Sequence, residues 1–260
     1  MKYIVEFAVC CHKGKVRTQN QDNFWSTRKF LERENNGLTA PLVGTVKSTD
    51  TPTFAVFDGM GGEQQGEVAA FIASETFNSL HNNKAKTEPK HFLLDSCMKM
   101  NEKICEYAKV NGIRHMGTTA VLLMFDGVNV FVCNIGDSRC YRYRKNQQTL
   151  LSCDHIETGV IIGKPPLTQN LGIPKTDFLI EPYIVKSNCC LGDKYLLCSD
   201  GLTDMVSEEE ISKIMSENSG VAECNEVLLQ KALNAGGKDN ITIILCQIQK
   251  QNHFFKFNKN

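Results

Sequence analysis

The stretch Thr53–Gly62, TFAVFDGMGG, decides the fold expected for this chain. Four apolar residues, Phe54 to Phe57, form a run of the length of a buried strand, and the run ends at Asp58 and a glycine-rich turn. Glycine has no Cβ atom, so the backbone here can approach an ion closely and the Gly59 carbonyl can serve as a ligand. Alone, the Asp-Gly pair would also suit an ordinary hairpin turn. The stretch predicts a strand that carries one carboxylate to the edge of a sheet.

Three more aspartates stand at comparable junctions. Asp22 and Asp239 come just before apolar runs, whereas Asp200, like Asp58, comes just after one. In antiparallel sheets the end of one strand lies beside the beginning of its neighbour. We therefore expect these four carboxylates to meet at one edge of the fold.

A cluster of carboxylates requires compensating positive charge, because like charges a few ångströms apart repel and raise one another's pKa. Ligands that are all oxygen favour hard ions such as Mg²⁺ or Mn²⁺ over zinc. Four negative charges match two divalent ions, and two ions about 4 Å apart suit an in-line displacement at phosphorus. The pattern predicts hydrolysis of a phosphoester.

Arg17 lies five residues before Asp22. Its guanidinium can hold a phosphate through two parallel hydrogen bonds, which a lysine cannot do. Without the neighbouring acids, a solvated surface charge would be the better interpretation. With them, we expect Arg17 to bind the phosphate of the substrate.

The bulk composition indicates one globular domain. The chain has 260 residues, of which 42% are hydrophobic, and no Pro/Ser-rich linker divides it. Its formal net charge is zero, which argues against nucleic acid and anionic membranes as partners. We expect a single domain over residues 1–248 and a polar tail over residues 249–260.

The amino terminus and the cysteines point to a reducing compartment. The first apolar run contains Glu6 and is too short for a signal peptide or a membrane span, so we expect it to be a strand. The twelve cysteines include the adjacent pairs Cys10-Cys11 and Cys189-Cys190 but no C-x-x-C motif. Cysteines within apolar runs pack as small hydrophobic residues. We expect a cytoplasmic protein.

Periodicity predicts the main elements. Apolar residues at helical spacing predict helices over residues 66–80, 91–110 and 221–234, and Ser207 with Glu210 forms a capping box before another helix. Two β-rich runs around Asp126-Gly127 predict a hairpin. Because a third strand, Arg139–Arg144, follows directly, we expect an antiparallel meander. We expect a loop from Leu151 to Pro182.

Two other motifs have competing interpretations. Cys133 to Arg139 fits C-x-x-G-x-x-R, the phosphate loop of cysteine-dependent phosphatases, but that loop requires a following helix and a strand-like CYRYR follows here. We interpret Cys133 as a buried strand residue. Asp154-His155 could be an acid/base pair, but a solvated turn fits better because neither residue lies on a periodic element. Asp204 is either a further ligand or, as we favour, a charge in the first turn of a helix.

Six motifs in order resemble the type 2C metal-dependent Ser/Thr protein phosphatases, in their compact bacterial form. They span Val16 to Ile244 and read VRTQNQD, FDGMGG, MGTT, GDSRCYRYR, SDGLTDMVS and GGKDNITII. The resemblance implies an α+β fold, a central sandwich of two antiparallel β-sheets flanked on both sides by pairs of α-helices. It also implies a flap segment, shortened here between Asp154 and Gly172.

The resemblance implies roles for the residues already singled out. Asp58 would bridge two Mn²⁺ or Mg²⁺ ions, and the Gly59 carbonyl would bind one of them. Asp200 and Asp239 would bind the other ion. Asp22 would act through a water molecule on a metal, and Arg17 would bind the phosphate of phosphoserine or phosphothreonine. These roles imply direct attack by water, with no phosphoenzyme.

Some positions depart from the family pattern. Gln21 replaces the usual glutamate beside Asp22, and Met60 stands where animal members carry a histidine. Ile113-Arg114-His115 stands where an aspartate supports a third metal, so we expect that third site to be weak or absent. With Met60 unable to donate a proton, we expect water on a metal to protonate the leaving group.

Two alternatives to this enzyme stay open. One is a catalytically weak regulator that binds phosphoproteins on the same fold, which the presence of every candidate acid disfavours. The other is the cysteine-dependent phosphatase, which would survive chelation and depend on Cys133. For the enzyme, we expect as partners the phosphoprotein substrates of a Ser/Thr kinase, and we expect a monomer.

Overall fold

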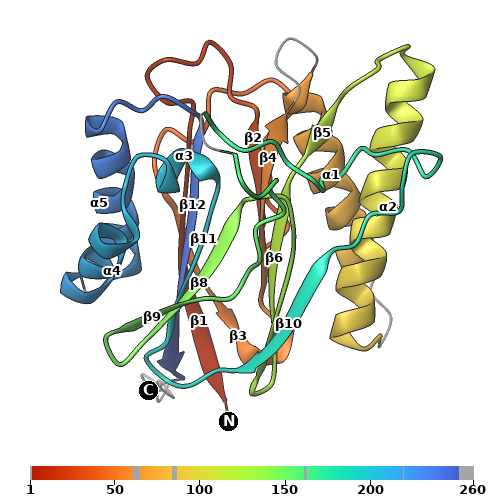
Figure 1. Ribbon diagram of the computed structural model, residues 1–260. Helices are drawn as coiled ribbons and strands as arrows, with labels where there is room; N and C mark the ends of the chain where they lie inside the picture. The colour runs from red at the N-terminus through yellow and green to blue at the C-terminus, as the bar shows by residue number, and fades with distance from the viewer. Residues whose placement is uncertain (1, 61–64, 84–86, 161–162, 219, 252–260) are drawn as a thin grey trace, which may run out of the picture.

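The computed structural model describes residues 2–60, 65–83, 87–160, 163–218 and 220–251. Two expectations thus lie partly outside the described residues: the turn glycines Gly61 and Gly62, and the polar tail beyond Gln251. The described chain builds four layers, with helices on either side of two stacked sheets (Figure 1).

Both sheets are antiparallel. The first sheet has the order β3 (Leu42–Lys47), β1 (Tyr3–His12), β12 (Ile241–Lys250), β11 (Lys194–Cys198), β8 (Arg139–Arg144) and β9 (Gln147–Leu150). The second has the order β10 (Tyr183–Asn188), β7 (Asn129–Ile135), β6 (Ala120–Asp126), β4 (Thr53–Met60) and β2 (Asp22–Ser26), with the short β5 (Gly117–Thr118) beside β4. The predicted amino-terminal strand is β1, and its first residue pairs with the last of β12, Lys250.

Side chains of the central strands alternate between two cores, as the period of two in a strand requires. Phe54 and Val56 of β4 enter the core between the sheets, whereas Ala55 and Phe57 face the helices behind the second sheet. β1 behaves in the same way in the first sheet. Both faces of each sheet are therefore buried, which is why β4 reads as a continuous apolar run.

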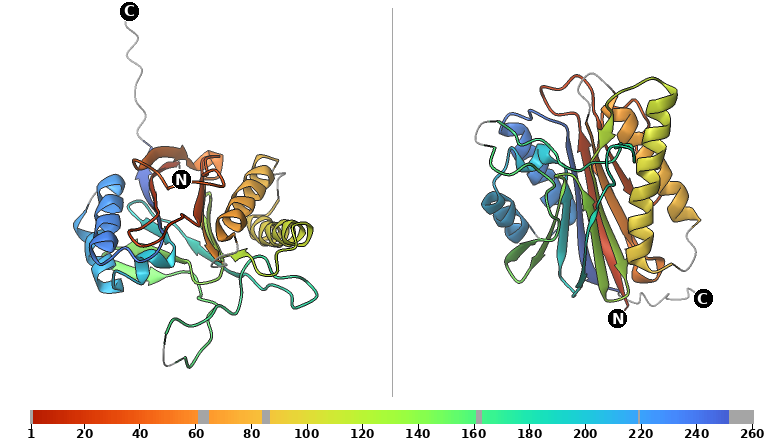
Figure 2. Two further views of the ribbon diagram at one scale, coloured as in Figure 1. Left: turned by 90° about the horizontal axis from the view of Figure 1, so that it is seen from above. Right: turned by 45° about the vertical axis from the view of Figure 1, so that its right-hand side comes forward.

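One pair of helices covers each sheet. α1 (Gly66–Asn82) and α2 (Pro89–Val110) pack on the second sheet, and α4 (Glu208–Glu217) and α5 (Val221–Asn234) pack on the first (Figures 1 and 2). Two short elements complete the described fold, the 3₁₀ turn η1 (Ser48–Asp50) and α3 (Asp200–Thr203). The expected sandwich with flanking helix pairs is confirmed.

Local signals set the helix ends. The Glu210 amide donates to Ser207 Oγ at 3.3 Å, so the predicted capping box begins α4. Gly236 and Gly237, both at positive φ, follow α5 and end it as expected. The chain then turns directly into β12, and Asp239 lies in that turn.

The expected meander is wrong. β6 and β7 form the predicted hairpin, but β8 does not pair with β7 and instead joins the first sheet between β11 and β9. The crossing takes place at Gly136, whose φ of 99° falls in the left-handed region that favours glycine, and a Cβ atom there would collide with Thr119. The chain thus changes sheets immediately before Asp137.

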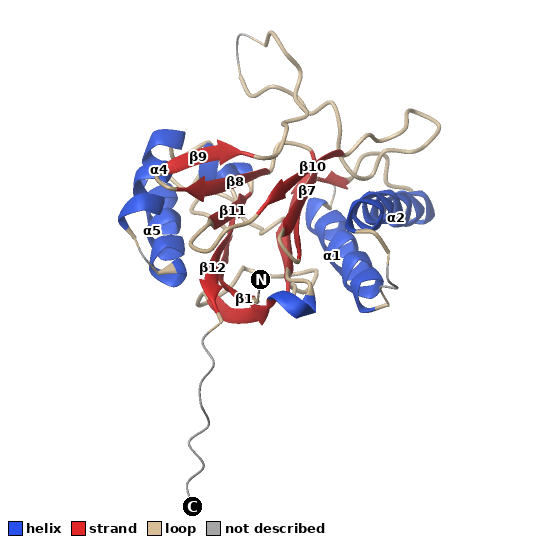
Figure 3. Ribbon diagram, turned by 90° about the horizontal axis from the view of Figure 1, so that it is seen from below, coloured by secondary structure: helices blue, strands red, loops and turns tan. Residues whose placement is uncertain are grey.

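The connection from β9 to β10, residues 151–182, projects from one side of the sandwich (Figure 3). Its described residues form no helix or strand, only the bridges Ile156 to Leu167 and Thr118 to Leu171. The expected loop is therefore confirmed, and it contains the flap segment between Asp154 and Gly172.

All twelve cysteines are free thiols. Ten of them are buried or half-buried in the sandwich or under its helices, and the other two, Cys153 and Cys190, are exposed. No helix within the described ranges has the length and apolar character needed to cross a bilayer.

Candidate functional site

The strand ends bring the predicted acids to one end of the sandwich, the upper end in Figure 1. Asp22 and Asp58 are direct partners in the β2–β4 ladder of the second sheet. Asp200 follows β11 and Asp239 precedes β12, and these two strands are neighbours in the first sheet. Half of the candidate acids thus come from each sheet.

A cavity of about 390 Å³ opens at this end. Its walls include five of the six predicted site residues: Arg17, Asp58, Gly59, Asp200 and Asp239. Asp22, the sixth, is only 2% exposed and lies behind this wall, beside Asp58.

Two hydroxyl groups hold the Asp22 carboxylate through one of its two oxygens. Ser199 and Thr242 donate hydroxyl hydrogen bonds to its Oδ2 at 2.8 and 2.7 Å. The other oxygen, Oδ1, is buried and has no hydrogen-bond partner within the described part of the chain. Burial and the charge of Asp239 raise the pKa of Asp22 to about 7, although the two hydroxyls and Arg17 act against this rise.

Hydrogen bonds to its backbone amide and carbonyl hold Asp58 in place. Its amide donates to Thr119 Oγ1 at 3.2 Å, and Thr118 Oγ1 donates to its carbonyl at 2.9 Å. The threonines of the MGTT motif thus fix the strand that carries this carboxylate. Burial raises the pKa of Asp58 well above its usual value, and the neighbouring carboxylates of Asp22 and Asp137 raise it further.

Gly59 permits a close approach of three segments. Its amide donates to the Gln21 carbonyl at 3.1 Å, and a Cβ atom at this position would collide with the backbone oxygens of Gln21 and Gly66. The site therefore requires glycine here for packing, in addition to any role of the Gly59 carbonyl as a ligand.

Arg17 pairs with Asp239. Its Nη2 donates to Asp239 Oδ2 at 2.7 Å, and this hydrogen bond raises the pKa of the guanidinium. The Arg17 side chain is 49% exposed at the mouth of the cavity. A guanidinium has five N–H donors, so most of them stay available to an incoming anion.

Sequence reasoning missed Asp137. This residue lines the same cavity, is 8% exposed, and has a raised pKa because of its burial. It falls within the stretch from Cys133 to Arg139 that fits the thiol motif. It follows an apolar strand just as Asp58 and Asp200 do, so the same junction pattern could have identified it.

Lys164 was also missed. Its ammonium group contacts the Asp200 carboxylate and lies 3.5 Å from carboxylate oxygens of both Asp137 and Asp204. Burial lowers its pKa, but the charges of Asp137, Asp204 and Asp58 outweigh that effect and raise it. Lys164 lies on the flap segment, where no periodic pattern could have related it to the acids. Asp204 belongs to this cluster as a half-exposed charge, but it caps the carboxyl end of α3, so its expected place in the first turn of a helix is wrong.

The chemistry of these donors fits a hard divalent cation. The donors are oxygens, one buried carboxylate oxygen of Asp22 lacks a partner among the described residues, and the Lys164 ammonium shows that the cluster holds a cation. Yet no three acidic, histidine or cysteine side chains in the described ranges stand close enough to grip an ion in this arrangement. Lys164 and Arg17 engage Asp200 and Asp239, so both acids would have to exchange these partners for a metal.

The thiol alternative finds no support at Cys133. Its side chain is fully buried, and the contact with Cys97 (Sγ to Sγ, 3.8 Å) and burial raise its pKa well above the usual value. The strand β8, not a helix, follows its loop. A nucleophilic thiol requires the opposite surroundings, exposed and electropositive.

The interpretation of Asp154 as part of a solvated turn is wrong. The Asp154 side chain is only 14% exposed and accepts two hydrogen bonds from the Arg139 guanidinium, at 2.9 Å from Nε and 2.6 Å from Nη2. Arg139 also contacts Glu208 at the start of α4. Asp154 therefore pairs with the arginine of the GDSR motif and anchors the beginning of the flap segment.

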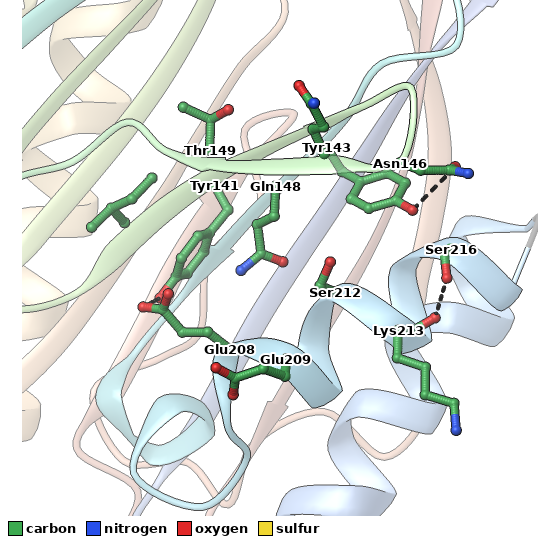
Figure 4. A pocket seen from close by; sticks show the side chains of 12 residues that line it. Tyr141, Tyr143, Asn146, Gln148, Thr149, Glu208, Glu209, Ser212, Lys213 and Ser216 are labelled. Carbon is green, nitrogen blue, oxygen red and sulfur yellow. Dashed lines mark hydrogen bonds between the residues drawn. The ribbon is translucent and has the colours of Figure 1, made fainter.

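A second cavity, of about 780 Å³, lies between the β8–β9 hairpin and α4 (Figure 4). Tyr141, Tyr143 and Gln148 project into it from the hairpin, opposite Glu208 and Ser212 on the helix. It contains none of the predicted site residues, so we assign the function to the acidic cavity.

Comparison with known proteins identifies relatives over nearly the whole chain. The profile of the protein phosphatase 2C family matches residues 43–235. The serine/threonine phosphatase stp of Listeria welshimeri is 29% identical, with 90% of this chain and 92% of the relative covered. Protein phosphatase PhpP of Streptococcus pneumoniae is 30% identical, with 95% and 99% covered.

Solved structures agree with these matches. The catalytic domain of the serine threonine protein phosphatase PstP, in complex with two manganese ions, has a TM-score of 0.75 and 26% identity, covering 95% of this chain and 100% of that domain. The PstP sequence of Mycobacterium tuberculosis is 28% identical over 94% of this chain, which spans 45% of that relative.

Proposed function

Because this chain belongs to the protein phosphatase 2C family, we propose that it hydrolyses phosphoserine and phosphothreonine monoesters in proteins at a binuclear Mn²⁺ or Mg²⁺ centre. The observation that carries the proposal is the meeting of Asp58, Asp200, Asp239 and Arg17 on one cavity, with Asp22 directly behind. The relatives named as serine/threonine phosphatases support the substrate class, and the two manganese ions in the PstP complex support the metal.

The proposed metal ligands come from both sheets. Asp58 lies beside Asp22 in its own sheet and shares the cavity with Asp200 and Asp239 of the first sheet. It would bridge two ions, and the Gly59 carbonyl would bind one of them. Asp200 and Asp239 would bind the second. Oδ1 of Asp22, which lacks a partner among the described residues, would accept a hydrogen bond from water on a metal. Burial raises the pKa values of Asp22 and Asp58, and the neighbouring carboxylates raise them further, a repulsion that two divalent ions would relieve.

The protein side chains then position the substrate. Ions of this kind, when bound, activate a water molecule for in-line attack and neutralise the phosphate oxygens. Arg17 stands half-exposed at the mouth of the cavity, where its free N–H groups can grip the phosphate in a bidentate fashion. Met60 lines the cavity but has no proton to give, so we infer that water protonates the leaving alkoxide.

Asp137 is relevant to the expected third metal site. It adds a fourth carboxylate to the cavity wall, next to Asp200 across the Lys164 ammonium group. The sequence led us to expect a weak or absent third site. We retain that proposal, and the number of tightly bound Mn²⁺ ions in calorimetry tests it, since three would refute it.

A catalytically weak phosphoprotein-binding regulator is the alternative. The full set of acids and the glycine that their packing requires count against it. We further propose that the substrates are phosphoproteins made by a Ser/Thr kinase, and that the protein acts as a monomer in the cytoplasm. Among the described residues, the free state of all twelve cysteines is consistent with such a reducing compartment.

Dephosphorylation of phosphoserine and phosphothreonine peptides tests the proposal. We expect release of phosphate that depends on Mn²⁺ or Mg²⁺, stops with EDTA, and falls by a factor on the order of a hundred or more in Asp239→Asn, because a metal ligand is lost. Cys133→Ser is the matched control and should retain activity.

Each other outcome has a clear meaning. Turnover that survives EDTA but not the Cys133 substitution would establish the thiol mechanism. Binding of phosphopeptide without any turnover in Mn²⁺ would establish the regulator.

A further inference from the structure

We propose that Ser199 and Thr242 are positioning residues for the metal centre: their hydroxyls lock one oxygen of Asp22 and turn the other toward the ions. This inference rests on the proposed function, because it concerns how that metal centre is held. Neither residue lines the acidic cavity, so both would act through Asp22.

The three residues come from different sheets. Asp22 begins β2 in the second sheet, whereas Thr242 lies on β12 and Ser199 follows β11 in the first. All three are buried, with Ser199 and Thr242 fully inaccessible to solvent. Two hydrogen bonds, at 2.8 and 2.7 Å, therefore join the sheets at the end where the acids gather.

The Ser199 hydroxyl donates its proton to Asp22. Ser199 Oγ accepts a hydrogen bond from the Thr242 amide at 3.0 Å, so its proton is available to Asp22. The Ser199 amide in turn donates to the Thr242 carbonyl at 3.1 Å. The backbones of both residues are thus paired, which fixes the direction of the donors.

The Thr242 hydroxyl has two candidate partners and one proton. Its Oγ1 lies 2.7 Å from Asp22 Oδ2 and 3.2 Å from Cys11 Sγ, and Cys11 Sγ already accepts from Asn20 Nδ2 at 3.2 Å. A carboxylate is a much stronger acceptor than a sulfur atom, so the proton goes to Asp22. The thiol of Cys11 can then donate weakly to Thr242 Oγ1.

Both donors reach the same oxygen of Asp22, and this has a geometric consequence. A carboxylate that is fixed at one oxygen cannot rotate freely, so Oδ1 keeps one direction. That atom is the buried acceptor without a partner in the described part of the chain. Outer groups of this kind orient the ligands of a metal, and their loss typically weakens metal binding about 10- to 100-fold.

The same bonds join the two halves of the site. Asp22 pairs with Asp58 across β2 and β4, while Ser199 directly precedes Asp200 and Thr242 lies three residues after Asp239. Ser199 and Thr242 therefore hold the acids of the first sheet in register with those of the second. A purely structural role would stabilise the fold alone, whereas a positioning role also sets metal affinity.

Mn²⁺ calorimetry on matched variants distinguishes these roles. Thr242→Val keeps the shape and removes the hydroxyl, and Thr242→Ser keeps the hydroxyl and removes the methyl group. Ser199→Ala tests the second donor without changing β12. Thr53→Val removes a buried hydroxyl that donates to the Thr51 carbonyl at the far end of β4, and serves as the control. Thermal unfolding in EDTA measures the stability of each metal-free variant.

We expect Thr242→Val and Ser199→Ala to raise the dissociation constant for Mn²⁺ by about tenfold or more, with Thr242→Ser and Thr53→Val close to wild type. Wild-type affinity in both Thr242→Val and Ser199→Ala would overturn the inference while leaving the proposed function intact. Equal weakening in Thr242→Ser and Thr242→Val would also overturn it, since the methyl group would then be responsible. A wild-type protein that binds no Mn²⁺ would overturn the proposed function and this inference with it.

Discussion

At the scale of single residues, the site is a group of buried acids with too little positive charge. Asp22 and Asp58 both have raised pKa values, mainly because burial disfavours their ionised forms. Metal-free protein therefore retains protons that an unfolded chain would release. This difference makes the stability of the metal-free protein depend on pH.

We predict that metal-free protein loses stability as the pH rises from about 4 to about 7. In that interval an unfolded Asp22, with a pKa of 3.8, has released its proton, whereas the folded side chain, with a pKa of about 7, still holds it. The stabilisation is complete below the unfolded pKa and is lost as the pH rises through the folded one, at up to about 1.4 kcal/mol per pH unit. Urea unfolding in EDTA at several pH values measures it.

Asp22→Asn is the control for that experiment, because an amide does not titrate. The variant should show a shallower dependence on pH over the same interval. An identical slope in wild type and variant would show that Asp22 keeps an ordinary pKa in the folded protein.

The predictability of individual residues followed their place in the chain. Asp22, Asp58, Asp200 and Asp239 stand where apolar runs begin or end, so the sequence could identify them. Asp137 shows the same pattern, but its turn also fits the thiol motif that begins at Cys133, and that motif suggests a different role for the turn. Lys164 and the paired hydroxyls could not be predicted, because their partners are fixed by tertiary contacts alone.

At the scale of elements, the flap segment contributes a charged side chain to the site. It carries Lys164 into the acid cluster, and its beginning is anchored by the pair of Asp154 with Arg139. The Lys164 ammonium and a divalent ion would compete for the same Asp200 carboxylate. Release of Lys164 from Asp200 would therefore be linked to metal binding.

We predict that Lys164→Gln binds Mn²⁺ more tightly than wild type. The change removes a cation that must leave Asp200 before a metal can bind, and the lysine is 49% exposed, so the gain should be on the order of 1 kcal/mol, or several-fold in affinity. Calorimetry measures it, with Lys175→Gln on the same β9–β10 connection as the control, since Lys175 is exposed and outside the acidic cavity. Weaker binding in Lys164→Gln would show that the lysine supports the metal instead.

Element types were predictable where local patterns decide them. The capping box of α4 and the β6–β7 hairpin have local signals, and both formed as expected. The predicted meander was wrong for a different reason. Consecutive strands are often neighbours, but no short sequence pattern indicates which sheet a strand will join. The turn at Gly136 and Asp137 carries β8 into the other sheet, and only packing determines that choice.

At the scale of the whole molecule, stability depends on the core between the two sheets. Phe54 is fully buried there, 5.3 Å from Phe7 and 6.4 Å from Phe125 between ring centroids. These three rings come from both sheets. They were recognisable as apolar strand residues, but the pairing of the sheets came from the family resemblance, because strand count alone allows several architectures.

We predict that Phe54→Ala lowers the free energy of unfolding by about 3 to 5 kcal/mol, through lost burial and the cavity that remains. Urea unfolding in EDTA measures the change without a contribution from metal. Val43→Ala, at a side chain that is 56% exposed on β3, should cost no more than about 0.5 kcal/mol. Equal losses in the two variants would contradict a core between the sheets.

The division of the acids between the two sheets has a consequence for the protein as a whole. An ion held by side chains from both sheets would bind the folded chain and not the unfolded one, so mass action would tie the folding equilibrium to the concentration of free Mn²⁺. Once that concentration exceeds the dissociation constant, each further tenfold increase adds about 1.4 kcal/mol per site to the folded state. Scarcity of the ion would thus shorten the lifetime of the protein as well as reduce its turnover.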